Sequence, residues 1–203
     1  ETAAACAEQV YDVVNKLGVS MSSEIGSALY AGILTDTGSF RHANITERTF
    51  SICQQVAAAG VDVAQLAADI YHNSSIGKIK LTGTLLENIR FEADNRIAIL
   101  YLSDQLLATT NCPQDDVDGL INIPLTAKAV QAVVLIKPQA ALTRVSLRSK
   151  AMLNVRAIAA SFGGGGHRNA AGFSSSATAD DIEKQVVSKL QKALDGSPEK
   201  STV

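Results

Sequence analysis

With 203 residues, 46% of them hydrophobic, the chain can bury a core and form one or two domains. Its formal net charge of −2 gives no overall attraction to long nucleic acid, so any nucleotide would have to bind at a local site. Three widely spaced cysteines argue against a disulfide framework and indicate small buried side chains in a reducing compartment. The sequence has no long uninterrupted apolar span, so we expect a cytoplasmic protein without membrane contact.

Residues 4–72 show the periodicity of helices. The pattern predicts helices over 4–17, over 22–36 with Ser22 or Ser23 as cap, over 46–59 and over 63–72. The second helix is apolar almost all round, as in a buried helix, and leads to Asp36. On the first helix the stripe expected to face inward consists of Val10, Val13, Val14 and Leu17.

After a polar, glycine-containing stretch at 73–77 and a helical piece at 79–88, the pattern changes to strands. We predict strands at 89–92 and 96–102 around a turn at Asp94-Asn95. A second antiparallel pair is expected at 130–136 and 142–147. Short helices are predicted from Ser103 or Asp104, over 115–121 and over 154–160. A last strand is expected at 173–176 and a terminal amphipathic helix at 180–194.

The stretch from Ser161 to Phe173 contains four consecutive glycines followed by His167 and Arg168. Glycines let backbone amides approach a ligand closely, and successive inward N–H groups form an anion-binding nest. The alternative is a helix C-cap followed by a flexible turn. The following Ala170-Ala171-Gly172 permits tight backbone packing, which a linker would not need. The stretch therefore favours a binding loop.

This stretch resembles the Gly-Gly-Gly-His-x-x-Ala-Ala-Gly signature of the C-terminal domain of DHH-family phosphoesterases. A second stretch, from Leu29 to Arg41 with Thr35-Asp36-Thr37-Gly38 at its centre, resembles the last metal-binding motif of the family's catalytic domain. The order and separation of both motifs also fit. The chain is most similar to the NrnA-like branch, whose members degrade short oligoribonucleotides and remove a phosphate from 3′-phosphoadenosine 5′-phosphate.

The resemblance implies an α/β fold in which the C-terminal helical part of a DHH catalytic domain precedes a mixed-sheet α/β substrate-binding domain. We expect the catalytic part at 1–75, a linker at 76–88 and the DHH-associated domain at 89–197. The family's Asp-containing motifs and Asp-His-His, which would lie upstream of Asp36, do not occur here. We therefore expect a fragment that holds the substrate-binding half and is inactive alone.

The resemblance also implies two divalent metal ions, with Mn²⁺ as the expected ion, in the full-length protein. Such a pair neutralises charge at phosphorus and activates water. Asp36 is the one metal ligand expected in this chain, and its alternative role is to cap a turn. His42 and His72 do not replace the missing ligands by any recognisable spacing, so no complete catalytic set is expected.

The substrate-binding residues follow from the same resemblance. Arg148, in Ser146-Leu147-Arg148-Ser149, would bind a phosphate with its guanidinium fork, and His167 would contact the phosphate beside the metals. The alternatives are a solvated strand arginine and a histidine bonded to nearby backbone. Asn122 matches an Asn-x-Pro position of the NrnA-like branch, although Leu125 stands where an Arg is expected. The complete set expected to bind substrate is Arg148, Gly164, Gly165, Gly166, His167, Asn122, Arg41 and Asn169.

Three functions compete at this point. The first is a manganese-dependent phosphoesterase that acts on short RNA, a mononucleotide or a dinucleotide, and that could be a homodimer. The second is a non-catalytic module that binds a nucleotide or a cyclic or linear dinucleotide. The third, a related domain that assists tRNA editing, is disfavoured by the Thr35-Asp36-Thr37-Gly38 motif and by the weakly acidic charge.

Overall fold

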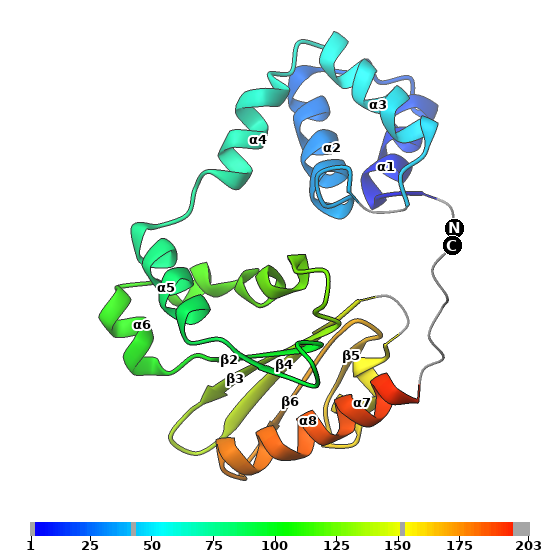
Figure 1. Cartoon of the computed structure of the whole chain (residues 1–203). Coiled ribbons are helices and arrows are strands. Elements are labelled where there is room, and N and C mark those ends of the chain that lie inside the picture. The colour runs from blue at the N-terminus through cyan, green and yellow to red at the C-terminus, as the bar shows by residue number, and fades with distance from the viewer. Residues whose placement is uncertain (1–2, 42–43, 151–152, 197–203) are drawn as a thin grey trace. The chain divides into compact units, whose positions relative to one another are not determined.

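The computed structural model describes residues 3–41, 44–150 and 153–196. The chain divides into two compact units, residues 1–73 and residues 74–203 (Figure 1). The first consists of helices, and the second of a mixed sheet with helices on both faces. The α/β fold class predicted from the sequence is confirmed. Among the described residues, none of the helices has both the length and the apolar character needed to cross a membrane.

Four helices form the first unit, and side chains near their beginnings fix where three of them start. They are α1 (Cys6–Lys16), α2 (Ser23–Asp36), α3 (Glu47–Ala58) and α4 (Val63–Tyr71). Ser22 accepts a hydrogen bond from the Ile25 amide, Thr46 forms a capping box with Thr49, and Asp62 accepts from the Gln65 amide. The core between them is built from Ala5, Leu29, Ile33, Ile52, Val56 and Val61.

The orientation predicted for α1 was wrong. Val10, Val13 and Leu17 are 47%, 55% and 72% exposed, whereas Glu8 is 1% exposed. The Glu8 carboxylate accepts hydrogen bonds from the Thr49 hydroxyl (2.6 Å) and the Ala4 amide (3.2 Å), and Arg48 lies 3.8 Å away. Because these partners satisfy a buried carboxylate, the face that packs on α2 and α3 need not be the most apolar one.

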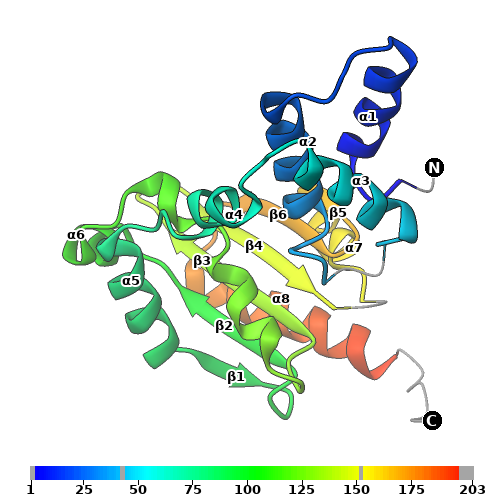
Figure 2. The same ribbon diagram turned by 90° about the horizontal axis from the view of Figure 1, so that it is seen from above.

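The sheet of the second unit joins parallel and antiparallel strands. In space the order is β1 (Arg90–Glu92), β2 (Ile97–Tyr101), β3 (Ala132–Pro138), β4 (Thr143–Ser149), β6 (Ala170–Ser175) and β5 (Gly165–His167), as Figure 2 shows. Only β2 and β3 pair in parallel among these strands. The glycine stretch was expected to be a loop, yet Gly165–His167 form the edge strand β5.

Helices cover one face of the sheet completely and the other face in part. α7 (Val155–Ala160) and α8 (Ala179–Asp195) pack on the face that carries Val134, Leu147 and Phe173. On the opposite face, α5 (Ile76–Glu87), α6 (Asp104–Thr110) and the 3₁₀ segments Gln114–Val117 (η1) and Leu120–Thr126 (η2) enclose a second core with Ala98, Leu100, Val133 and Leu135. That second core contains no residue of β5 or β6.

Two further details differ from the sequence-based expectations. The helix expected at 79–88 is present as α5, but its Leu81 and Leu85 are buried in the second core, so the segment 76–88 belongs to the second unit and is not a linker. Of the cysteines, Cys112 is buried and Cys53 half-buried, but Cys6 is exposed rather than buried. Burial raises the pKa of the Cys112 thiol and also that of the Cys53 thiol.

Candidate functional site

Asp36 is the last residue of α2, and its side chain is exposed. The carbonyl end of a helix carries partial negative charge, and a carboxylate there deepens the local negative potential. Such a position attracts a cation. Asp36 therefore has the charge, and stands at the kind of helix end, that would suit one ligand of a metal ion.

A strained turn follows Asp36. Gly38, Ser39 and Phe40 are consecutive residues in the left-handed region, with φ of 56°, 59° and 59°. Each non-glycine residue in that region costs about 1–2 kcal/mol. Thr37 holds the turn from inside: it is fully buried, its hydroxyl donates to the Ile33 carbonyl (2.7 Å) and accepts from the Phe40 amide (3.1 Å). Backbone strain that the surroundings maintain is typical of functional sites.

Two polar side chains support the same turn from outside. Ser39 donates to the Tyr71 hydroxyl (2.8 Å), and Tyr71 donates to the Leu34 carbonyl (3.4 Å). Arg41 donates from Nε to the Gly38 carbonyl at 2.6 Å. Arg41 is exposed, so the rest of its guanidinium remains accessible while it braces the turn.

The described residues do not by themselves provide the ligands of a two-metal site. In residues 3–41, 44–150 and 153–196, no three His, Cys, Asp or Glu side chains gather where they could hold a metal ion. His72 ends α4 as its C-cap, as expected, whereas His42 lies outside the described residues. Asp36 can thus contribute one ligand, and a complete metal site would need ligands from outside these residues.

In the second unit, the strand register brings Arg148 and His167 onto one face. Arg148 on β4 lies opposite Ala170 on β6, and Ala170 lies opposite His167 on β5. Directly paired residues of neighbouring strands point to the same side of a sheet, and strands are about 4.8 Å apart. Arg148 and His167 therefore stand two strands apart, about 10 Å between backbones, with the Ala170 methyl between them.

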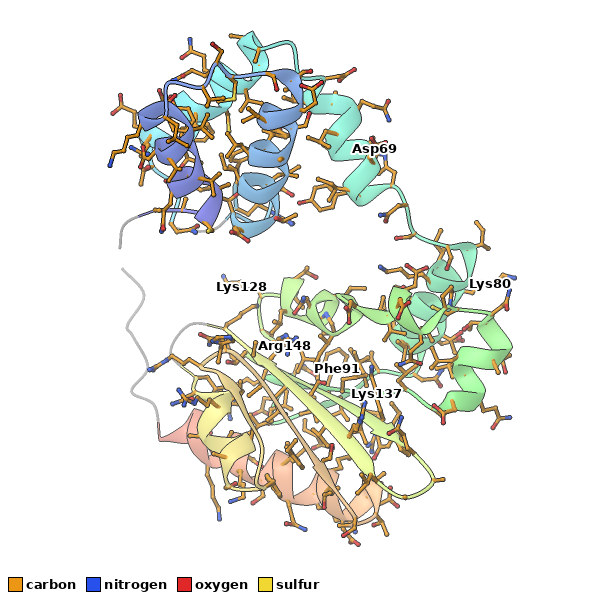
Figure 3. All side chains as sticks on the ribbon, turned by 180° about the vertical axis from the view of Figure 1, so that it is seen from behind. Asp69, Lys80, Phe91, Lys128, Lys137 and Arg148 are labelled. Atoms are coloured by element: carbon orange, nitrogen blue, oxygen red, sulfur yellow. The ribbon has the colours of Figure 1, made fainter. Side chains whose placement is uncertain are left out.

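The face between these two side chains is made of small residues. The next paired row contains Ser146, Gly172 and Gly165, so the surface beside Arg148 and His167 is flat and partly exposed. On the side of β3, η2 packs against β3 and β4. We call this surface the β4–β6–β5 shelf, formed by Ser146, Arg148, Gly165, His167, Ala170 and Gly172. Figure 3 shows Arg148 on the side of the sheet away from α8.

The glycines behind this shelf have different tasks. The Gly164 amide donates to the Ala159 carbonyl (2.9 Å) and the Gly163 amide to the Ala160 carbonyl (3.0 Å), which is a Schellman cap of α7 with Gly163 at φ 78°. The Gly164 amide, expected to bind substrate, is therefore already occupied in this structure. His167 and Ala170 flank a two-residue turn, so they form a hydrogen-bonded pair, and the next pair, Gly166 with Ala171, is a non-hydrogen-bonded one. The Gly166 amide therefore points away from β6, to the open edge of β5.

The two asparagines of the expected set also differ in whether their side chains are available to a ligand. The Asn169 side-chain amide donates to the Ser149 hydroxyl (2.9 Å) and the Leu153 carbonyl (3.2 Å), so it joins the end of β4 to the segment before α7. Asn122 is exposed on η2, at the β3 side of the sheet. Asn169 thus acts on the architecture of the shelf, and Asn122 remains available to a ligand.

Two hollows of the second unit lie away from this shelf. One, of about 370 Å³, is lined by α7 and α8 and includes Asn154, Ser161 and Lys189. The other, of about 350 Å³, lies between α5, the end of β2 and α6, and includes Tyr101 and Ser103. Neither of these two hollows is lined by Arg148 or His167.

Sequence reasoning did not single out Thr37, Ser39 and Tyr71 as supports of the Asp36 turn. It also did not assign Ser146, Ala170 and Gly172 to a binding surface. The alternation of Arg144-Val145-Ser146-Leu147-Arg148 would have placed Ser146 beside Arg148. No local pattern predicts which strand lies next to β4, and this pairing creates the shelf.

The comparisons with known proteins agree with this architecture. A model of the DHHA1 domain matches residues 94–196, which is about half of the chain. The chain therefore belongs to the DHHA1 domain family, as the motif resemblance implied. A solved structure of an exopolyphosphatase-related protein from Bacteroides fragilis superposes with a TM-score of 0.88 at 25% identity, over 96% of this chain and 59% of that one.

Curated relatives narrow the resemblance to the NrnA-like branch. The bifunctional oligoribonuclease and PAP phosphatase NrnA of Thermus thermophilus is 32% identical over 83% of this chain and 50% of its own length. The probable bifunctional oligoribonuclease and PAP phosphatase NrnA of Streptococcus mutans is 30% identical over 93% of this chain and 61% of its own. The chain spans about half to three fifths of the length of these relatives.

Proposed function

We propose that the second unit binds the phosphate of a nucleotide on the β4–β6–β5 shelf. The observation that carries this proposal is the single row in which Arg148 and His167 face the same side across the small Ala170. Arg148 donates one internal hydrogen bond, from Nη1 to the Leu147 carbonyl (3.0 Å). The guanidinium has five N–H donors, so most of its fork remains for a phosphate.

The small residues of the shelf give a phosphate and its sugar access to the backbone. A Cβ added at Gly165 would meet no atom within 4 Å, which means that this position opens to solvent. The exposed Gly166 amide and His167 lie on the same edge strand. Arg148 and His167 offer donors to an anion from two sides of the Ala170 methyl, and nothing bulky stands between them.

For the whole protein, we propose a phosphoesterase that uses two divalent metal ions, Mn²⁺ being the expected one. Its substrates would be short oligoribonucleotides, 3′-phosphoadenosine 5′-phosphate, or both. The chain described here would supply Asp36 as one metal ligand, and the shelf as the substrate-binding part. The names of the Thermus thermophilus and Streptococcus mutans relatives support this choice of substrates. The purified 203-residue chain should not hydrolyse them in the presence of Mn²⁺.

A second candidate is a nucleotide-binding module without catalysis. It is favoured by one observation, that the described residues bring together no donor set for a metal ion. Both candidates use the same shelf. They differ in whether the whole protein hydrolyses a short oligoribonucleotide, which a turnover assay with Mn²⁺ decides.

Titration of the chain with adenosine monophosphate, followed by amide NMR shifts, tests the shelf. A few charge-assisted hydrogen bonds predict an affinity of about millimolar to high micromolar. Arg148→Ala should weaken binding about tenfold, and His167→Ala should weaken it less because the charged fork of Arg148 remains. Arg156→Ala, an exposed arginine on α7 on the opposite face, is the matched control. If Arg148→Ala and Arg156→Ala bind as the parent does, the shelf is not the phosphate site.

A further inference from the structure

Positive charge continues along β4 beyond the shelf. Strand alternation places Arg144, Ser146 and Arg148 on the same face, because Val145 and Leu147 between them are buried against the α7 and α8 side. Lys137 on β3 lies directly opposite Arg144, and Ser174 on β6 lies opposite it on the other side. Figure 3 shows Lys137, like Arg148, on the side of the sheet away from α8.

Lys137 and Arg144 form a pair of like charges that the described fold does not neutralise. Their Cβ atoms are about 5 Å apart in a direct antiparallel pair, and like charges in such a pair repel. Within the described part of the chain, neither side chain takes part in an ion pair. Arg144 is exposed and Lys137 half-buried. An anion placed between them would remove the repulsion, whereas folding alone gains nothing from this pair.

The distance from this pair to Arg148 matches two phosphate-to-phosphate repeats of a nucleic acid backbone. Four residues along an antiparallel strand cover about 14 Å. Successive phosphates of a nucleic acid are joined by six backbone bonds. Three peptide backbone bonds span up to about 3.5 Å, so six bonds span about 7 Å. The pair and Arg148 are thus separated by about two phosphate repeats, with the small Ser146 between them.

We propose that Lys137 and Arg144 bind the backbone phosphate of an oligoribonucleotide two repeats away from the phosphate held by Arg148. This inference rests on the proposed function of the shelf and adds the length of substrate that it recognises. A nucleotide with one phosphate reaches Arg148 alone. A 5′-phosphorylated trinucleotide is the shortest ligand that reaches both positions. Lys137 and Arg144 therefore select for oligonucleotides over mononucleotides.

The test is a length series of ligands on the full 203-residue chain. The probes are adenosine monophosphate and the 5′-phosphorylated di- and triadenylate, titrated by amide NMR shifts at several salt concentrations. The variants are Lys137→Gln/Arg144→Gln and Arg148→Ala. The matched control is Lys184→Gln/Lys192→Gln, which removes two exposed positive charges from α8 on the opposite face of the sheet.

We expect the parent to bind the trinucleotide more tightly than the dinucleotide. Lys137→Gln/Arg144→Gln should lose about fivefold in trinucleotide affinity, as two exposed charge contacts predict. For this double variant, the negative slope of log trinucleotide affinity against log salt should become shallower by about 0.7, the value for one phosphate contact on a single strand. Binding of adenosine monophosphate should be unchanged, and the α8 control should bind all three ligands as the parent does.

The other outcomes separate the two proposals. If Arg148→Ala weakens every ligand while Lys137→Gln/Arg144→Gln binds the trinucleotide like the parent, the shelf stands and the second phosphate position is wrong. If Lys137→Gln/Arg144→Gln weakens adenosine monophosphate and trinucleotide equally, the pair acts only by general charge and selects no length. If the parent binds none of the ligands, or Arg148→Ala changes nothing, the proposed function fails and this inference fails with it.

Discussion

Gly164 and Gly165 are neighbours in sequence, yet an added methyl group should affect them in opposite ways. A Cβ at Gly164 would collide with the Gly172 carbonyl oxygen and Phe173 Cβ, and would lie 2.8 Å from Phe173 Cα. These atoms belong to the backbone of β6 or lie next to it, and Phe173 is itself buried and stacked on Phe162. These atoms cannot move without separating β6 from the glycine stretch that leads into β5. A Cβ at Gly165 would meet nothing within 4 Å.

The expected magnitudes follow from this contrast. Overpacking of a well-packed region costs typically 1–3 kcal/mol, and occasionally more, so Gly164→Ala should destabilise the second unit by about 3 kcal/mol. Gly165→Ala should leave its stability within about 0.5 kcal/mol, as for a surface substitution. Because the Gly165 position opens onto the shelf, the same Gly165→Ala should weaken the binding of adenosine monophosphate while folding is retained.

Native-state hydrogen exchange of the β3 and β4 amides measures the stability of the second unit alone. It does not require the two units to unfold in a single two-state transition. Exchange of these amides should accelerate in Gly164→Ala and stay as in the parent in Gly165→Ala. Equal protection in Gly164→Ala and the parent would refute the close approach of the glycine stretch to β6. Unchanged nucleotide binding in Gly165→Ala would instead count against the shelf as the place where the ligand lies.

Two further predictions concern the turn after Asp36 and the alkaline side of the stability curve. Thr37→Val should destabilise the first unit by about 1–3 kcal/mol, measured by hydrogen exchange of α2. The substitution removes the hydroxyl that donates to the Ile33 carbonyl and leaves the Phe40 amide without its partner. The conservative Thr37→Ser should retain most of the stability. Burial, together with a hydrogen bond to Glu183, raises the pKa of Tyr101 well above its usual value. The stability it contributes is fully present below the unfolded pKa of about 10 and is lost as pH rises through the higher folded pKa. Burial also raises the pKa of Tyr30, so ultraviolet titration should show more than one late ionisation, and Tyr101→Phe should abolish the last of them.

Much of the local structure could be predicted because its causes lie within a few residues. Ser22, Asp62, Ser103 and Asn154 each accept a hydrogen bond from an amide three residues later, and the predicted helices begin where these caps stand. The turn around Asp94-Asn95 joins β1 and β2 as expected, with positive φ at Ala93, Asp94 and Asn95. The glycine motif is likewise a contiguous stretch, within residues 94–196, so the sequence alone was enough to indicate the DHHA1 domain.

Tertiary structure decided the features that depend on contacts between distant residues. The inward face of α1 follows from Thr49 and Arg48, about forty positions after Glu8, which satisfy its buried carboxylate. Arg148 and His167 share a face only because β6 inserts between β4 and β5 in a register that pairs Ala170 with both. Local propensity does not fix these pairings, because a shift of one residue leaves each strand's own sequence unchanged and turns every side chain to the other face.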